Sequence, residues 1–205
     1  MIRKCVHMVT INVILGSSRA NAAGRHLFNY LQTHQPPFTN PADVQLNFMD
    51  IASYDLPFFN EPEAPMDHPN RTLTPPEQQW LNDLQAGDGY VILTPEYNHS
   101  IPAVLKNGLD YVAFEMQGKP VRVLTYAPSA RGGQFAFLAL LPTLNQLGCW
   151  VLPKPTIIGR VTQNFTADGE MPVDAPAAGR YPDRLERMLQ ELAFYAQLLR
   201  ENRFA

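Results

Sequence analysis

The sequence predicts an α/β fold, in which a parallel β-sheet is covered by helices on both faces. Two observations carry this prediction. Short apolar runs alternate with longer segments whose apolar residues recur every three or four positions, the pattern of strands alternating with amphipathic helices. Three of the runs are also followed by turns of small and polar residues, 16–24, 95–100 and 129–133. Ligands of open α/β sheets bind where the carboxyl ends of the strands meet such turns.

Composition narrows the class of protein. At 205 residues, 45% of them hydrophobic and 17% charged, we expect one globular domain over residues 1–205. A formal charge of −3 gives no reason to expect nucleic acid or an anionic membrane as a partner. The only cysteines are Cys5 and Cys149, too few for a disulfide framework, which favours the cytoplasm. The histidines lack metal-ligand spacing, so we expect no metal, and without a long apolar run we expect no membrane span.

The first half of the chain supplies two strands and one helix. Val9 to Leu15 is β-branched and apolar, so it reads as a buried strand, and Arg25 to His34 has helical spacing. Val44 to Asp50 alternates apolar and polar residues, which predicts a half-buried strand near an edge of the sheet.

A long proline-rich connection, 51–76, follows the second strand. Connections of this length in compact domains are usually functional or mobile. Its aromatic pair, Phe58 and Phe59, could lie in the core, cover a bound ligand or face a partner subunit, and we favour the last two together. Thr74 followed by Pro75 and Pro76 predicts the start of the next helix.

A third strand, 89–93, is expected to stop at Thr94-Pro95, because proline cannot continue a central ladder. After the polar turn, Pro102 is predicted as the first residue of a helix. The remaining elements are a strand from Pro120 to Tyr126, a helix from about Gln134 to Leu147, a short strand within 150–158 that prolines interrupt, a surface excursion over 160–179, and a final amphipathic helix from Asp183 to Asn202.

The first turn, 16–24, has the composition of an anion-binding site. Small residues between a strand and a helix leave backbone N–H groups free to converge on an anion, and the helix amino terminus adds a favourable dipole. Arg19 can add a charge-assisted contact to a phosphate. Neither GxGxxG nor the P-loop lysine motif is present, which argues against a dinucleotide Rossmann site and a P-loop NTPase. Taken alone, GSSR is equally compatible with an ordinary turn.

Pro-Glu-Tyr-Asn at 95–98, Ile-Pro at 101–102 and Leu-Lys-Asn at 105–107 closely resemble the flavin-contacting loop of the NADPH-dependent FMN reductase family. GSSR at 16–19 resembles the phosphate loop of that family, and the turn at 129–133 resembles its third flavin-contacting turn. The resemblance covers nearly the whole chain. It departs at Ala22, where many relatives carry a hydroxyl or basic residue, so backbone amides are expected to replace side-chain contacts there.

The resemblance implies a flavodoxin-like, doubly wound five-stranded parallel sheet of order 2-1-3-4-5, with FMN at the switch point between strands one and three. It also implies hydride transfer from NADPH, with NADH possible, through FMN to a small-molecule acceptor such as a quinone, an azo compound or a free flavin. The family further implies a homodimer or homotetramer. The residues expected to contact the cofactor are Ser17, Arg19, Asn21, Ala22, Ala23, Gly24, Pro95, Glu96, Tyr97, Asn98, His99, Ser129, Ala130, Arg131, Gly132 and Gly133.

Several roles within these turns stay open at this stage. Glu96 either lines the site or accepts hydrogen bonds from backbone. His99 is either a proton donor or, the reading we favour, a structural histidine. Lys106 is expected to be a solvated or loop-pairing cation and not a catalytic base. Arg131 either meets the phosphates of the nicotinamide nucleotide or points into solvent. Flavin chemistry requires no side chain as acid or base, so no catalytic residue is assigned.

Two other functions use the same fold. A flavodoxin-type electron carrier is the first, but it would carry a hydroxyl-rich phosphate loop and a more acidic surface around the flavin than this sequence has. The second is a flavin-binding regulatory or stress-response module. Because fold alone does not determine function, the motifs in the three turns favour the reductase.

Overall fold

The structure is a computed structural model that describes residues 8–35 and 44–202. Its centre is a parallel sheet in the order β2-β1-β3-β4-β5, with β6 also pairing with β4, which confirms the predicted order. The strands are β1 (Val9–Leu15), β2 (Val44–Asp50), β3 (Gly89–Pro95), β4 (Pro120–Tyr126), β5 (Trp150–Val151) and β6 (Thr156–Ile158). All five predicted strand positions are filled, and β2 lies at an edge as expected.

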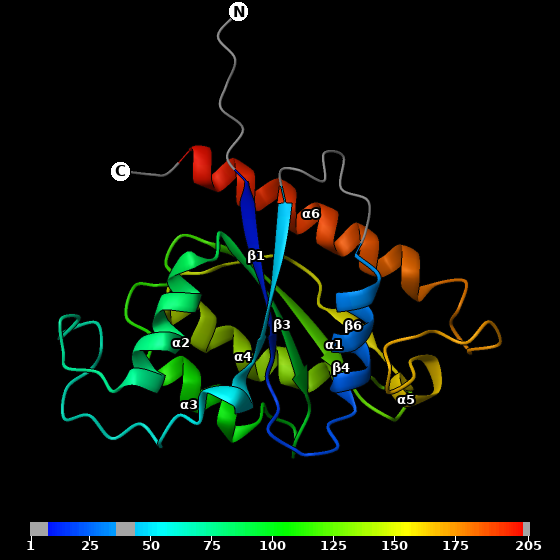
Figure 1. Ribbon diagram of the computed structural model, residues 1–205, viewed down its shortest axis with the longest axis horizontal. Coiled ribbons are helices and arrows are strands. Elements are labelled where there is room, and N and C mark those ends of the chain that lie inside the picture. Colours follow the sequence, from blue (N-terminus) through cyan, green and yellow to red (C-terminus); the bar gives the residue numbers. More distant parts are fainter. Residues whose placement is uncertain (1–7, 36–43, 203–205) are drawn as a thin grey trace, which may run out of the picture.

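Helices cover both faces of this sheet (Figure 1). They are α1 (Gly24–Thr33), the 3-10 turn η2 (Ile51–Tyr54), α2 (Pro75–Ala86), α3 (Ala103–Asp110), α4 (Gln134–Gln146), α5 (Val161–Asn164) and α6 (Tyr181–Glu201). Pro102 immediately precedes α3 instead of beginning it. The sheet separates two apolar clusters, one with α1 and α6 and the other with α2, α3 and α4.

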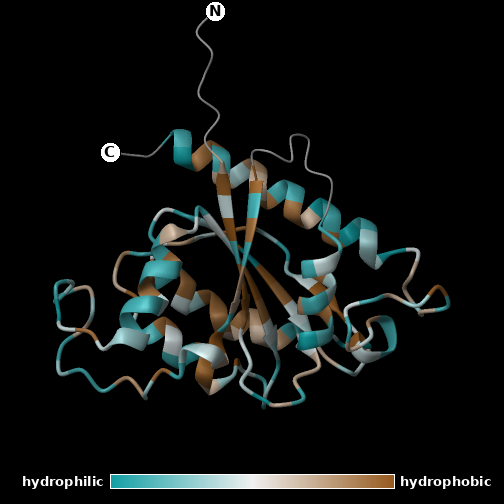
Figure 2. Ribbon diagram, viewed as in Figure 1, coloured by the Kyte–Doolittle hydropathy of each residue, from teal (hydrophilic) through white to brown (hydrophobic). Residues whose placement is uncertain are grey.

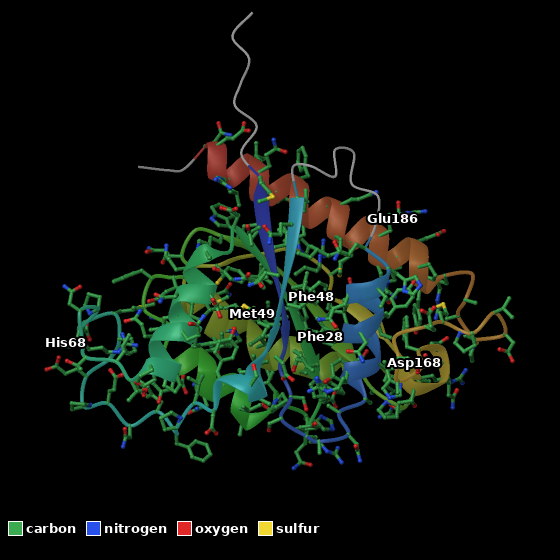
Figure 3. All side chains as sticks on the ribbon, viewed as in Figure 1. Phe28, Phe48, Met49, His68, Asp168 and Glu186 are labelled. Carbon is green, nitrogen blue, oxygen red and sulfur yellow. The ribbon has the colours of Figure 1, made fainter. Side chains whose placement is uncertain are left out.

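The edge strand β2 illustrates how neighbouring residues serve the two faces. Phe48 packs edge-to-face on Phe28 of α1, with ring centroids 5.3 Å apart, whereas Met49 lies in the cluster of the opposite face. Figure 3 labels all three side chains. Successive side chains of a strand point to opposite faces, so one strand contributes to both cores. The interior strands are apolar along most of their length (Figure 2).

The expectation that the third strand stops before Thr94-Pro95 is wrong. β3 continues through both residues, which pair with Thr125 and Tyr126 of β4. The pairing with the other neighbour, β1, ends two residue pairs earlier, where Leu15 aligns with Leu93. Pro95 therefore has a neighbour on one side only, and a missing N–H is tolerated there.

The expected interruption of the last strand is present, because it is split into β5 and β6 with Pro153 and Pro155 between them. One other expectation is wrong. The segment 160–179 is not simply a surface excursion, because it contains α5 and buries Phe165 and Ala177 against the core. Its apolar residues are too widely spaced to reveal this by periodicity.

The long connection between β2 and α2 is fastened to α3. The Asn107 side chain accepts a hydrogen bond from Phe59 N (2.8 Å) and donates one to Pro57 O (2.7 Å). Phe59 packs edge-to-face on Tyr111, with centroids 5.2 Å apart, and so belongs to the core side of the connection. Phe58, in contrast, is 81% exposed. The expectation that both rings cover a ligand or meet a partner is therefore wrong for Phe59, and only Phe58 stays available for those roles.

Candidate active site

The three polar turns lie at the carboxyl edge of the sheet, which is its lower edge in Figure 1. Each turn follows a strand, β1, β3 or β4, and direct contacts join them. The first and second turns meet through the hydroxyls of Ser17 and Tyr97, 3.0 Å apart. Glu96 of the second turn accepts a hydrogen bond from Phe135 N at 2.9 Å, in α4 directly after the third turn. A Cβ at Gly133 of the third turn would lie 3.3 Å from Glu96 N. The predicted convergence of the turns is therefore present.

The first turn presents backbone amides at the start of α1. Ser17 and Ala22 are buried, whereas Arg19 and Asn21 are exposed. Within the described chain, α1 has no side-chain cap hydrogen bond and no acidic residue in its first turn. The first N–H groups of a helix lack intrahelical partners and carry partial positive charge. This end of α1 therefore suits an anion.

Gly24 brings the helix close to the sheet. A Cβ atom added at Gly24 would lie 2.1 Å from Cζ and 2.3 Å from the hydroxyl oxygen of Tyr126. No residue larger than glycine fits there unless Tyr126 moves. The first residue of α1 thus sits directly on the tyrosine that ends β4.

Tyr126 is a residue that the sequence reading missed as part of the site. Its hydroxyl is buried and has no hydrogen-bond partner among the described residues. Burial raises the pKa of the Tyr126 phenol above its ordinary value and nearby Tyr97 adds to the shift, whereas the Ser17 side chain and the charges of Arg25 and Arg19 act in the opposite direction. The net effect is a raised pKa, so the hydroxyl stays protonated. A buried donor without a partner costs about 1–3 kcal/mol. A ligand oxygen near Gly24 would remove that cost.

The second turn is a two-residue hairpin. Tyr97 N donates to Ser100 O at 2.9 Å, and Ser100 N donates to Tyr97 O at 3.0 Å. The central residues, Asn98 and His99, have φ values of 49° and 61°, as a type I′ turn requires. Left-handed backbone at non-glycine residues costs about 1–3 kcal/mol each and is concentrated at functional sites. The Asn98 and His99 side chains are exposed.

His99 stacks on Phe135 of α4, with ring centroids 4.6 Å apart and planes 22° apart. This contact supports the structural reading of His99. Glu96 also makes a hydrogen bond that supports the structure, although not within its own loop. Its carboxylate accepts a hydrogen bond from Phe135 N, in the first turn of α4. A carboxylate is favoured at a helix amino terminus. Glu96 therefore fixes the spacing between the second and third turns.

Glycines let the third turn pack tightly. Gly132 and Gly133 have φ values of 67° and 72°, which favour glycine. A Cβ at Gly133 would lie 2.9 Å from Tyr126 O, and one at Gly159 would lie 2.5 Å from Ala130 O. Gly159, which follows β6, is a second supporting residue that the sequence reading missed. Ser129 and Arg131 remain exposed at the rim.

The Leu-Lys-Asn motif supports the turns from beneath. Leu105 is fully buried, and a Cβ at Gly16 would lie 2.9 Å from its Cδ2. Asn107 holds the connection at Pro57 and Phe59, as described above. Lys106 lies on the outer face of α3 and pairs with Asp110. The motif therefore shapes the site mainly through packing.

These features fit a flat, phosphate-bearing cofactor. The uncapped end of α1, Arg19 and the unpartnered Tyr126 hydroxyl suit its phosphate, and the glycines of the third turn allow close approach of a ring. Among residues 8–35 and 44–202, no group of three or more His, Cys, Asp or Glu residues is arranged to hold a metal. No described helix is both long and apolar enough to cross a membrane.

Comparison with known proteins points to the same cofactor. The sequence profile of the NADPH-dependent FMN reductases matches residues 9–163. An NAD(P)H-dependent FMN reductase of Nectria sp is 28% identical over 202 residues, covering 95% of this chain and 98% of that protein. A quinone reductase of Escherichia coli strain K12 is 31% identical over 159 residues, covering 74% of this chain and 77% of that protein.

Among solved structures, the flavoenzyme NAD(P)H:(acceptor) oxidoreductase FerB of Paracoccus denitrificans is similar, with a TM-score of 0.66. It is 20% identical, covering 95% of this chain and 98% of that one, and so supports the fold. The sequence profile spans most of the chain, including all three turns. On this evidence the chain belongs to the NADPH-dependent FMN reductase family.

Proposed function

We propose that this protein transfers a hydride from a reduced nicotinamide nucleotide, through FMN bound at the carboxyl edge of the sheet, to a small electron acceptor such as a quinone. The observation that carries the proposal is the joining of the three turns by the Ser17–Tyr97 and Glu96–Phe135 contacts. Family membership supports the activity and both cofactors, FMN and NAD(P)H. It does not favour a simple electron carrier.

The phosphate of FMN is assigned to the first turn. In this proposal the backbone amides of Asn21, Ala23 and Gly24 and the Arg19 guanidinium bind the phosphate, and the Tyr126 hydroxyl donates to one of its oxygens. The Ala22 amide already donates to Arg19 O at 3.0 Å. Arg19 already lies over the Tyr97 ring, 5.7 Å from its centroid. Because the Ser17 hydroxyl is paired with Tyr97, we assign Ser17 mainly to holding the second turn in register.

The isoalloxazine ring is assigned to the other two turns. Residues 95–99 line one edge of the ring, with Asn98 as the side-chain hydrogen-bond donor. Residues 129–133 face its pyrimidine end, where backbone donors stabilise the negative charge that reduction brings. FMN supplies the atom that accepts and releases the hydride. The protein contributes position and electrostatics, so no side chain is assigned as acid or base.

The nicotinamide nucleotide and the acceptor are assigned to the same open face in alternation. Arg131 is exposed at the rim of the third turn, where it can pair with a phosphate of the nucleotide. Phe58, which is 81% exposed, extends the apolar surface available to a flat acceptor. We propose quinone-like or similarly flat, electron-poor molecules as acceptors.

We further propose that the protein is a homodimer or homotetramer and works in the cytoplasm. Leu138, on the outer side of α4, is 59% exposed, and α4 is apolar around much of its circumference. An apolar helix face of this kind is typical of a subunit contact. The buried Cys149 is a free thiol, which fits a reducing compartment.

The visible spectrum of the purified protein, with one equivalent of NADPH then added without oxygen, tests the function. We expect flavin absorption near one FMN per chain that bleaches rapidly with NADPH and returns when a quinone is added. Bleaching by dithionite but not by NADPH or NADH would instead indicate a carrier. Protein that cannot bind added FMN would overturn the proposal.

A pair of variants tests the assignment of the phosphate end. Arg19→Gln should weaken FMN binding about tenfold, the typical value of one charge-assisted contact. Lys106→Gln is the matched control, because Lys106 is an exposed cation paired with Asp110 on the outer face of α3. Equal FMN affinity in both variants would contradict the role of Arg19.

A further inference from the structure

A basic groove lies between α6 and the split end of the sheet, separate from the three turns. It is a cavity of about 430 Å³, formed by residues of β4, the β5–β6 connection and the start of α6. Its cationic residues are Arg122, Lys154, Arg180, Arg184 and Arg187. No residue of the turns 16–24, 95–100 or 129–133 is among those that line it.

The charge of the groove is opposite to that of the chain. Five cationic side chains line it against two carboxylates, Asp183 and Glu191, whereas the formal charge of the whole chain is −3. Like charges brought together repel one another, and the repulsion costs free energy unless something compensates it. Such a concentration in an acidic protein suggests an anionic ligand.

The outer cations of the groove are available for a ligand. In the part of the chain that the structure describes, no ion pair engages Lys154, Arg180, Arg184 or Arg187. Arg184 donates only to the backbone carbonyl of Ile157, at 3.2 Å.

Arg122 supplies the second, independent observation. It is only 4% exposed, and its guanidinium donates to Pro153 O (2.6 Å), Lys154 O (2.8 Å) and the Glu191 carboxylate (2.5 Å). Its Nε is buried and has no hydrogen-bond partner among the described residues. Burial lowers the pKa of Arg122, while Glu191 acts in the opposite direction. An anion in the groove would add to the stabilisation that Glu191 already gives this buried charge.

The amino terminus of α6 adds to the same field. Arg180 occupies its N-cap position, without a side-chain cap hydrogen bond, and Gly179 beside it lines the groove. The helix dipole places partial positive charge at this end. The helix dipole, the arginines without ion pairs and the buried charge of Arg122 therefore favour the same kind of ligand.

We infer that this groove binds the phosphoryl groups of a small phosphorylated molecule, at a site distinct from that of FMN. Arginine binds phosphate oxygens through paired N–H groups, and a diphosphate carries enough charge to balance the excess in the groove, unlike a single carboxylate. Two sources share this chemistry: a phosphorylated metabolite that binds on its own, and the phosphates of a nicotinamide dinucleotide. The inference does not depend on the reductase activity.

The test is a titration of inorganic pyrophosphate into FMN-saturated protein, followed by calorimetry and by the rise in melting temperature. We expect saturable binding that weakens with added salt. The double variant Arg180→Gln/Arg187→Gln, which changes only exposed side chains, should bind at least tenfold more weakly. Asp183→Asn removes an opposing carboxylate and should bind several-fold more tightly.

Arg19→Gln is the control that separates this site from the proposed phosphate end of FMN. Pyrophosphate affinity should be the same as in the unaltered protein. A loss in Arg19→Gln without a loss in the double variant would place the pyrophosphate in the first turn and overturn the inference. Absence of binding at millimolar pyrophosphate would overturn it as well.

Competition identifies the source of the phosphoryl group. If NADP⁺ displaces pyrophosphate and NAD⁺ does so less well, the groove takes the 2′-phosphate of the dinucleotide. If neither displaces it, the ligand is a separate phosphorylated metabolite. Both results support the groove as a phosphoryl site. In either case the double variant must bind pyrophosphate more weakly than the unaltered protein.

Discussion

The two ends of the sheet treat their polar groups in opposite ways. Near the amino ends of the strands, Asp88 accepts hydrogen bonds from Thr10 N (2.9 Å) and Arg200 (2.8 Å). Asn12 is fully buried, donates to Asp83 O (2.7 Å) and accepts from Asn47 (3.0 Å). These groups satisfy one another and hold distant segments together.

At the carboxyl ends, polar groups are left open. The buried hydroxyls of Thr125 and Tyr126 have no partner among the described residues, and α1 begins without a cap. Asn98 and His99 are held in left-handed backbone. Apart from the Nε of Arg122, near the start of β4, paired polar groups mark the end that stabilises the fold, and unpaired groups with local strain mark the end to which we assign FMN.

The substitution expected to disturb the carboxyl end of the sheet most is Gly24→Ala. The new methyl group would collide with Tyr126, so we expect the free energy of unfolding to fall by about 3 kcal/mol and FMN binding to be lost. Urea denaturation and FMN titration measure the two effects. Gly179→Ala is the control, because a Cβ there meets nothing within 4 Å and should change stability by less than about 0.5 kcal/mol.

A substitution at the amino end should act on stability alone. Asp88→Ala leaves Thr10 N and Arg200 without their acceptor, which should cost about 2 kcal/mol in the free energy of unfolding. FMN affinity, measured by fluorescence titration, should not change. Asp88→Asn keeps one acceptor oxygen and should cost less. Weaker FMN binding in Asp88→Ala would show that the two ends are coupled.

Alkaline pH should also lower the free energy of unfolding, through Cys149 near the amino end of the sheet. Burial raises the pKa of the Cys149 thiol from 9.0 to about 12. Between these values the unfolded chain loses a proton that the folded chain keeps. This group therefore leaves the free energy of unfolding unchanged below pH 9 and lowers it as the pH rises toward 12. One such group contributes a slope of about 1.4 kcal/mol per pH unit. Urea denaturation of Cys149→Ala should show a shallower decrease; parallel curves would contradict this.

The smallest and most diagnostic effect is expected for Tyr126→Phe. Removing a buried hydroxyl that lacks a partner should raise the free energy of unfolding by about 1 kcal/mol without FMN. The same change should weaken FMN binding about tenfold, because a donor to the phosphate is lost. A gain in the free energy of unfolding together with a loss of FMN affinity would show that this hydroxyl serves the ligand and not the fold. A loss of stability without FMN would mean that the hydroxyl is structural.

Much of the fold could be predicted because the strands are uniformly apolar and the helices periodic. The strand order followed from this alternation together with the family resemblance, and the three turns converge as parallel topology requires. The predicted end of the third strand before Thr94-Pro95 was wrong. Proline is excluded only where a strand has neighbours on both sides, and the sequence does not show that β1 has already ended there. Burial of Phe165 and Ala177 escaped notice because isolated apolar residues in a long connection carry no period.

The sequence motifs predicted the three turns of the candidate site but not the residues that support them from other elements. Tyr126 reads in the sequence as the last residue of an apolar strand, and only its contact with Gly24 reveals its place beneath α1. The partner of Glu96 lies 39 positions away, in α4. The contacts of Gly159 with Ala130 likewise depend on how β6 lies beside β4. Such contacts follow from three-dimensional packing and leave no local signal.

The split between β5 and β6 has a consequence for behaviour at high concentration. A long, straight strand at this position would expose a row of unpaired N–H and C=O groups, a template for pairing with another molecule. Here two strands of two and three residues are separated by a stretch that contains Pro153, Lys154 and Pro155. Proline and lysine are among the residues that discourage such pairing. The interruption that opens the basic groove therefore also protects this side of the sheet against aggregation.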